Sequence, residues 1–210
     1  MKVLAFSLLA LAETVLGGDR DAPKAAVGIY IEFDHPSTDA ELSLLESEVR
    51  SILAPLGFDL RWRDMEAAGH EAWADLALVT FRGHCDLASI PPKFDPVAPS
   101  LGETHLVDGR IQPYAEIECD RIGALVKPQL ALVRRQDRER LLQRAIARVV
   151  AHELYHIFVG TAAHKSTGVG KAEFTASDML SDRFQFAPAQ AHALIQTSAA
   201  DVLQTSRYGR

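Results

Sequence analysis

Segments with strand-like and helix-like hydrophobic spacing follow one another along the first half of the chain. Residues 27–33 (VGIYIEF) and 76–81 (LALVTF) are apolar runs of strand length, and the second is continuous, which is typical of a strand covered on both faces. Residues 58–63 alternate apolar and polar side chains, as a half-buried strand does. Apolar residues at helical spacing over residues 42–56 predict a helix between the first strand and this half-buried one.

A turn signal in the middle of the chain predicts a β-hairpin. Asp108 and Gly109 stand between residues 104–107 and residues 110–119, two segments with the composition of strands. An Asp-Gly pair favours the tight two-residue turns that join antiparallel strands. We therefore expect two antiparallel strands here.

The longest helical pattern covers residues 138–159, and Asp137 is its expected N-cap. Its apolar residues cover a wide arc of the helix, which predicts burial on more than one side. Arg140, Arg144 and Arg148 recur every four residues on the opposite side. We interpret this arginine stripe as a solvated face.

The order of these elements predicts an α+β fold, with an open mixed β-sheet backed by helices. Gly160 ends the long helix, and the chain is expected to be irregular from there until Pro188, where a last helix begins and runs to about Ser198. A chain of 210 residues buries about 70% of its unfolded surface and needs no metal to hold its core together. A metal site in it is therefore more often functional than structural.

The N-terminus resembles an export signal. Lys2 precedes the short apolar run VLAFSLLALA, and small residues follow that suit cleavage, so residues 1–17 are expected to be a signal peptide and residues 18–26 a linker. A first β-strand or a short buried helix is the alternative interpretation of the run. Export predicts a secreted or periplasmic protein, in which Cys85 and Cys119 form a disulfide rather than two buried thiols.

Charge and hydropathy argue against nucleic-acid binding and against a membrane span. The formal net charge is −6, whereas nucleic-acid binding requires a basic surface, so we expect no nucleic-acid partner. No apolar run approaches the 20 or so residues needed to cross a bilayer, so we expect no membrane span. The sequence does not indicate the oligomeric state.

The most specific chemical signal is HELYH at residues 152–156, an HExxH motif late in the long predicted helix. On a helix, His152 and His156 project from one face about 40° apart and can share a metal ion. Glu153 lies about 100° round from His152, beside the metal, where it can act as a general base. The alternative is a pair of surface histidines without a ligand role.

A catalytic zinc ion needs a third protein ligand, and three candidates follow the motif. His164 comes four residues after Gly160, where the chain can turn back towards the metal. Glu173 and Asp178 are carboxylates further along the chain. We favour His164 because of its ligand type and because the helix stops just before it.

These residues resemble the metzincin clan of zinc peptidases, whose signature is HExxHxxGxxH. In this chain the pattern is HExxHxxxGxxxH, with Gly160 one position and His164 two positions later than in the clan. The resemblance implies zinc ligation by His152, His156 and His164. It also implies a zincin-like fold, with residues 27–160 as an upper lobe and residues 161–210 as a smaller, mostly irregular and helical lower lobe.

Two further features follow from the resemblance. Residues 101–107 correspond to the clan's antiparallel edge strand, which binds the substrate above the cleft. Met179 is the candidate for the methionine of the turn that lies below the metal in the clan.

The resemblance implies a zinc-dependent metalloendopeptidase that hydrolyses peptide or protein substrates with a zinc-activated water and with Glu153 as the general base. Two alternatives remain open. One is a catalytically inactive, secreted binding module with a zincin fold, and the other is a zinc hydrolase that acts on something other than a peptide.

Overall fold

The computed structural model describes residues 25–69, 71–73, 75–91 and 100–197. The expected signal peptide (1–17), most of the expected linker and most of the proline-rich segment 91–99 lie outside the described residues. The division into an upper and a lower lobe at residue 160 stays a prediction. Across the described residues, no helix has the length and apolar character that a membrane span requires.

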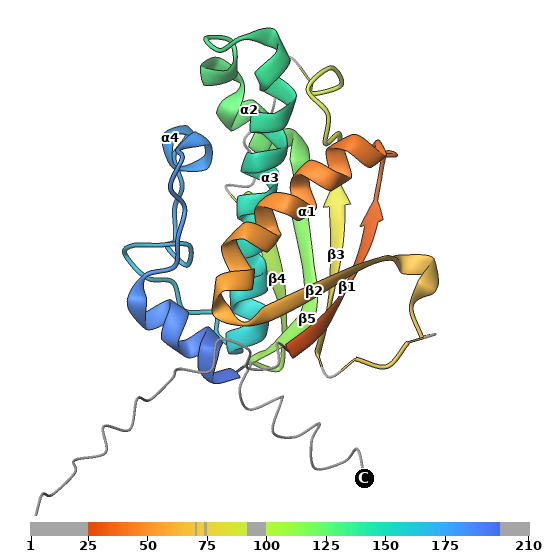
Figure 1. Cartoon of the computed structure of the whole chain (residues 1–210), viewed down its shortest axis with the longest axis vertical. Helices are drawn as coiled ribbons and strands as arrows, with labels where there is room; N and C mark the ends of the chain where they lie inside the picture. The colour runs from red at the N-terminus through yellow and green to blue at the C-terminus, as the bar shows by residue number, and fades with distance from the viewer. Residues whose placement is uncertain (1–24, 70, 74, 92–99, 198–210) are drawn as a thin grey trace, which may run out of the picture.

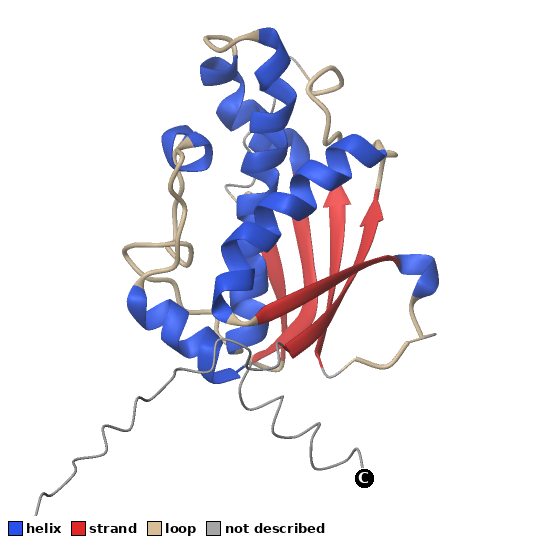
Figure 2. Ribbon diagram, in the orientation of Figure 1, coloured by secondary structure: helices blue, strands red, loops and turns tan. Residues whose placement is uncertain are grey.

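A five-stranded mixed sheet forms the centre of the molecule, in the order β2-β1-β3-β5-β4 (Figure 2). Neighbouring strands are parallel except for β4, which pairs antiparallel with β5 at one edge. This arrangement confirms the expected α+β fold. The strand bounds are β1 Ala25–Phe33, β2 Phe58–Asp64, β3 Asp75–Arg82, β4 Gly102–Val107 and β5 Arg110–Glu118.

Helices cover one face of this sheet (Figure 1). Helix α1 (Asp39–Leu53) begins with a capping box, in which the Thr38 side chain accepts from the Glu41 backbone N–H and the Glu41 side chain accepts from that of Thr38. A 3-10 turn over Ala54–Leu56 follows, and Gly57 closes it in the left-handed conformation (φ 95°). These boundaries agree with the helical spacing of the sequence.

The predicted hairpin is confirmed. Asp108 and Gly109 both have positive φ (50° and 73°), as the tight turn requires, and they join β4 to β5. The ladder shifts register between Thr104 and Leu106. Because β4 pairs on one side only, its other edge remains available along the described part of the sheet.

Helix α2 (Cys119–Leu130) corrects the expectation that the strand of the hairpin continues to Cys119. The strand ends at Glu118, and Ile122, Val126 and Leu130 then form a buried stripe with helical spacing. Cys119, the first residue of the helix, forms the predicted disulfide with Cys85 at a Cα–Cα distance of 4.9 Å.

Helix α3 (Arg135–Val159) is the longest helix and is buried on all sides in its second half. It begins three residues before the predicted start, and the prediction of Asp137 as its N-cap is wrong. The N-cap is Arg134, which makes no side-chain capping bond, and its Nε donates to Asp137 in the first turn. The helix ends as predicted, with Gly160 in the left-handed conformation (φ 65°).

The segment after Gly160 is less irregular than expected. A short helix, α4 (Ala176–Leu180), begins with a capping box between Thr175 and Asp178. A last helix then covers residues 188–197 of the described chain, close to the predicted position. The expectation of a solvated arginine stripe is confirmed for Arg140, which is exposed, but it is wrong for Arg148, which is buried between α3, α1 and the segment that follows α4.

Candidate metal centre

The candidate site lies in a cleft of about 730 Å³ between the edge strand β4 and the segment after α3. Helix α3 forms its floor, with Val149, His152, Glu153 and His156. One wall is formed by residues 100–104 and Leu106, and the opposite wall by Ala162, His164 and residues 172–174. The cleft therefore gathers every residue of the HExxH pattern to which a chemical role was assigned.

His152 and His156 face each other across one turn of α3. Their side chains are buried, with residues 6% and 4% exposed, and their Nε2 atoms lie 3.0 Å apart. Burial lowers the pKa of both imidazoles, that of His152 to about 4. Both rings are therefore neutral at physiological pH.

Each of these rings is held by a main-chain carbonyl from the segment that follows the helix. His152 Nδ1 lies 2.7 Å from the carbonyl oxygen of Val169, and His156 Nδ1 lies 2.6 Å from that of Thr161. A carbonyl can only accept, so Nδ1 carries the proton in both rings. Each Nε2 is left with a lone pair, and the two lone pairs point into the same space.

His164 completes a group of three. Its ring stacks on that of His152, with centroids 5.2 Å apart, and lies 4.8 Å from that of His156. One ligand atom from each of the three histidines lies within 4.8 Å of the others, and no other such group of three occurs among the described residues. Gly160 makes this possible, because its left-handed backbone reverses the chain directly after the helix. The role of the three side chains as metal ligands stays a prediction.

Glu153 lies beside this group and is 4% exposed. Its Oε2 accepts a hydrogen bond of 2.7 Å from Thr104 Oγ1, on β4. Burial raises its pKa to about 7, although the bond from Thr104 acts in the opposite direction. A carboxyl group with this pKa can both accept and release a proton near neutral pH.

Close approach of β4 to α3 depends on Gly102. A Cβ at this position would lie 2.8 Å from Glu153 Oε1 and 2.8 Å from Val149 Cγ1. Gly102 and Thr104 thus shape the surroundings of Glu153. Sequence analysis did not identify either residue, since glycine and threonine are common in edge strands.

The two other candidate third ligands are placed differently. Asp178 forms the capping box of α4 and an ion pair of 2.7 Å with Lys171. Burial acts to raise its pKa, but Lys171 and the Thr175 hydrogen bonds outweigh this and lower the pKa to about 2. Glu173 lines the cleft but does not belong to the group of three ligand atoms.

An aromatic side chain that sequence analysis missed packs against the histidines. Phe174 meets the His152 ring edge-on, with ring centroids 5.4 Å apart. No local sequence pattern marks Phe174, because the contact arises only when the chain after Gly160 folds back.

Met179, the candidate for the turn below the metal, is buried within α4.

The three nitrogen donors fit a zinc ion. Neutral imidazoles bind zinc through Nε2, and hydrogen bonds from Nδ1 to carbonyl groups fix the ring orientation in such sites. Two facing lone pairs 3.0 Å apart repel each other unless a cation or a proton lies between them. Protonation is disfavoured by burial, so a metal cation is the better counterpart.

Replacing His164 tests the third ligand. We expect His164→Ala to lose most zinc affinity, because it removes one of the three nitrogen donors that are predicted to hold the ion. Glu173→Ala and Asp178→Ala are matched controls and should keep their zinc. Competition with a chelator measures the zinc affinity of the parent and the three variants. Full zinc binding by His164→Ala would contradict the assignment of His164 as a ligand.

Replacing Glu153 tests its environment in the metal-free protein. The folded-state pKa of about 7 exceeds the ordinary value of 4.5. The contribution of Glu153 to the free energy of unfolding therefore falls as the pH rises between these values. Relative to the parent, Glu153→Gln should therefore gain up to about 3 kcal/mol in unfolding free energy from pH 5 to pH 8. His152, whose pKa shift acts in the opposite direction, is common to both proteins and cancels.

Denaturant unfolding of chelator-treated protein at the two pH values provides the measurement. An equal difference between Glu153→Gln and the parent at pH 5 and pH 8 would show that Glu153 is not desolvated.

Comparison with known proteins gives one structural match. No family model matches the sequence, and no curated protein does. Among solved structures, the crystal structure of an archaemetzincin from Methanopyrus kandleri aligns with 84% of this chain and 96% of its own, at 11% sequence identity and a TM-score of 0.46. The assignment of the site therefore rests on its own geometry.

Proposed function

We propose that this protein is a zinc-dependent metalloendopeptidase. The observation that carries the proposal is the pair of buried His152 and His156 Nε2 atoms, 3.0 Å apart, with His164 completing the group. Glu153 lies next to this group in the floor of the cleft but is not one of its three members. Three imidazole ligands and a separate buried carboxyl group are the set that zinc-dependent hydrolysis requires.

In this proposal the histidines hold the ion and Glu153 moves the proton. When bound, zinc supplies Lewis acidity, which makes a water molecule more acidic and polarises the substrate carbonyl. Glu153 accepts the proton of the attacking water and passes it to the leaving amine. The hydrogen bond from Thr104 holds the Glu153 carboxyl group in place and leaves Oε1 without this partner.

The edge strand β4 is the proposed binding surface for the substrate backbone. An extended peptide can add to an exposed sheet edge through main-chain hydrogen bonds, and this edge lines the cleft. No Lys or Arg lies among the residues that line the cleft in the described structure. A terminal carboxylate thus lacks a basic partner there, which favours cleavage within a chain.

The proposed location is secreted or periplasmic. A disulfide between Cys85 and Cys119 supports it, because such bonds persist in oxidising compartments and are rare in a reducing cytosol. The expected signal peptide belongs to the same proposal.

Glu153→Gln tests the mechanism. The variant keeps the three histidines, so it should bind zinc like the parent, but its peptidase activity should fall by about 10²–10⁴-fold because the amide cannot accept a proton. Hydrolysis of an unstructured protein substrate, followed with and without chelator, provides the measurement.

The same experiment separates the alternatives. Parental activity in Glu153→Gln would contradict the role of Glu153. Zinc binding without hydrolysis of any peptide would favour the binding module or the non-peptidase hydrolase.

The charge of the cleft predicts a preference among peptides. Its exposed charged residues are Glu103 and Glu173, both acidic. We expect kcat/KM to be about two- to five-fold higher for peptides with Lys or Arg near the cleaved bond than for matched peptides with Glu. Glu173→Gln should reduce this ratio.

Glu66→Gln is the matched control, since it removes the same charge after β2, at the other edge of the sheet. An equal ratio in the parent and in Glu173→Gln would show that Glu173 does not select substrates.

A further inference from the structure

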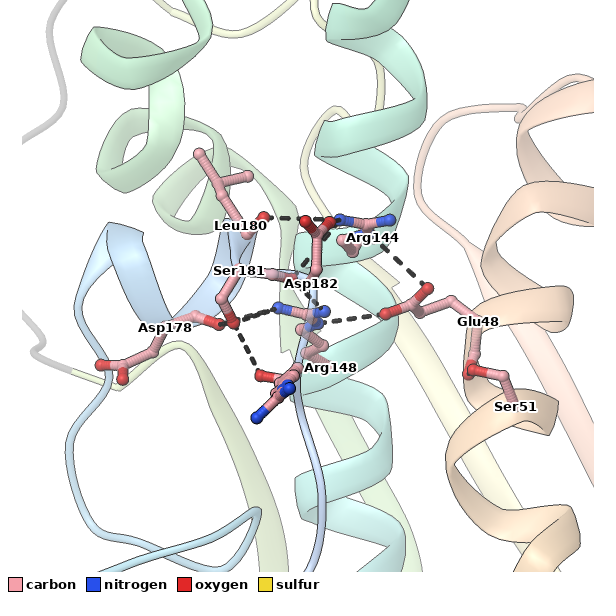
Figure 3. Close-up of polar contacts among 9 residues, drawn as sticks. Glu48, Ser51, Arg144, Arg148, Asp178, Leu180, Ser181 and Asp182 are labelled. Carbon is pink, nitrogen blue, oxygen red and sulfur yellow. Dashed lines mark hydrogen bonds and ion pairs between the residues drawn. The ribbon is translucent and has the colours of Figure 1, made fainter.

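Arg148 is a buried cation on α3, one turn before His152. Its side chain is 2% exposed, and its Nε forms an ion pair of 3.1 Å with Glu48 of α1. Nη1 donates to the carbonyl oxygen of Asp178 at 2.8 Å, and Nη2 to that of Ser181 at 2.7 Å. These carbonyls lie at the end of α4, so the guanidinium joins α1, α3 and α4 (Figure 3).

Aromatic contacts lead from Arg148 to the metal centre. The Arg148 guanidinium lies over the ring of Phe184, with Cζ 4.8 Å from its centroid. Phe184 contacts Phe174 at 5.7 Å between centroids, and Phe174 meets the His152 ring at 5.4 Å. Each contact is a direct packing contact.

Residues 171–178 are braced by contacts among their own side chains. Lys171 pairs with Asp178 and lies over the Phe174 ring, with Nζ 5.1 Å from its centroid. The capping box of Thr175 fixes the start of α4. This braced segment carries Phe174 and Glu173 of the cleft wall. Arg148 ties the chain at the end of α4 to α3, together with Arg144, which donates to the carbonyls of Leu180 and Ser181 and pairs with Asp182.

We infer that Arg148 is a positioning residue for the metal centre, acting through Phe184 and Phe174 on the His152 ring. The inference rests on the metal site in the proposed function, but not on peptidase activity. Phe174 packs against the His152 ring, whose orientation is also set by the hydrogen bond to the Val169 carbonyl, and so restricts rotation of the ring. A ring held in one orientation aims Nε2 at the metal, and loosening such support typically costs about 10–100-fold in metal affinity.

The test compares zinc affinity in full-length variants by competition with a chelator. Arg148→Met should weaken zinc binding by about 10-fold or more. Arg148→Lys should fall between this variant and the parent, because lysine keeps the charge but not the planar fork that reaches both carbonyls. Phe184→Leu leaves the polar contacts of Arg148 in place, yet should weaken zinc binding because the aromatic route is broken.

Arg140→Gln is the matched control. Arg140 belongs to the same arginine stripe but is exposed, and its replacement should leave zinc affinity unchanged. Thermal unfolding of each metal-free variant separates a loss of stability from a loss of affinity. If Arg148→Met does not fold, Phe184→Leu decides the inference.

Two results would overturn the inference. One is a lower unfolding temperature in Arg148→Met and Phe184→Leu with parental zinc affinity, which would assign Arg148 a purely structural role. The other is a parent that binds no zinc, which would remove the metal site as well. A parent that binds zinc but cleaves no peptide would contradict the proposed peptidase alone, while weaker zinc binding by Arg148→Met and Phe184→Leu would still support the role of Arg148.

Discussion

Two hydrogen bonds, from the Nδ1 atoms of His152 and His156 to main-chain carbonyl groups, fix the geometry on which the candidate site depends. The acceptor at His152, the carbonyl of Val169, belongs to a segment that is itself held by the last helix. Gln190 is 1% exposed and its amide donates to Thr167, and the backbone at Gly168 approaches that of Ala187 so closely that a Cβ would lie 2.5 Å from its nitrogen. The helix over residues 188–197 thus helps hold the carbonyl group that orients His152 on α3.

Helix α3 buries polar groups on two sides, and only on one side are these groups fully compensated by partners. Arg148 has an ion pair with Glu48 and donates to two helix-terminal carbonyls, so its charge is compensated within the protein. Glu153 has the hydroxyl of Thr104 as a side-chain partner, and the two histidine Nε2 atoms face each other. Buried groups that lack compensation cost stability, and such groups concentrate at functional sites.

Sequence reasoning succeeded where the signal is local. The turn at Asp108–Gly109, the end of α3 at Gly160 and the one-face spacing of His152 and His156 each depend on a few consecutive residues. It failed where a distant segment decides.

Arg140 and Arg148 belong to the same stripe of arginines on α3. Of these two, Arg148 is buried, because α1 and the segment after α4 pack against it. Phe174 and Val169 carry no local pattern, since their roles exist only after the chain folds back. Helix α2 could have been recognised from the spacing of Ile122, Val126 and Leu130, although Pro128 within the helix obscures the pattern.

The disulfide between Cys85 and Cys119 has a consequence for the proposed peptidase. It closes a covalent loop that contains the whole of β4, one wall of the cleft, and the whole of β5. A single cut of the backbone anywhere inside this loop leaves both new ends attached to the molecule. The strand that forms the wall then stays tethered next to α3 and can pair again with β5. If the proposed peptidase cuts its own chain inside this loop, the cross-link keeps the wall of the cleft in place.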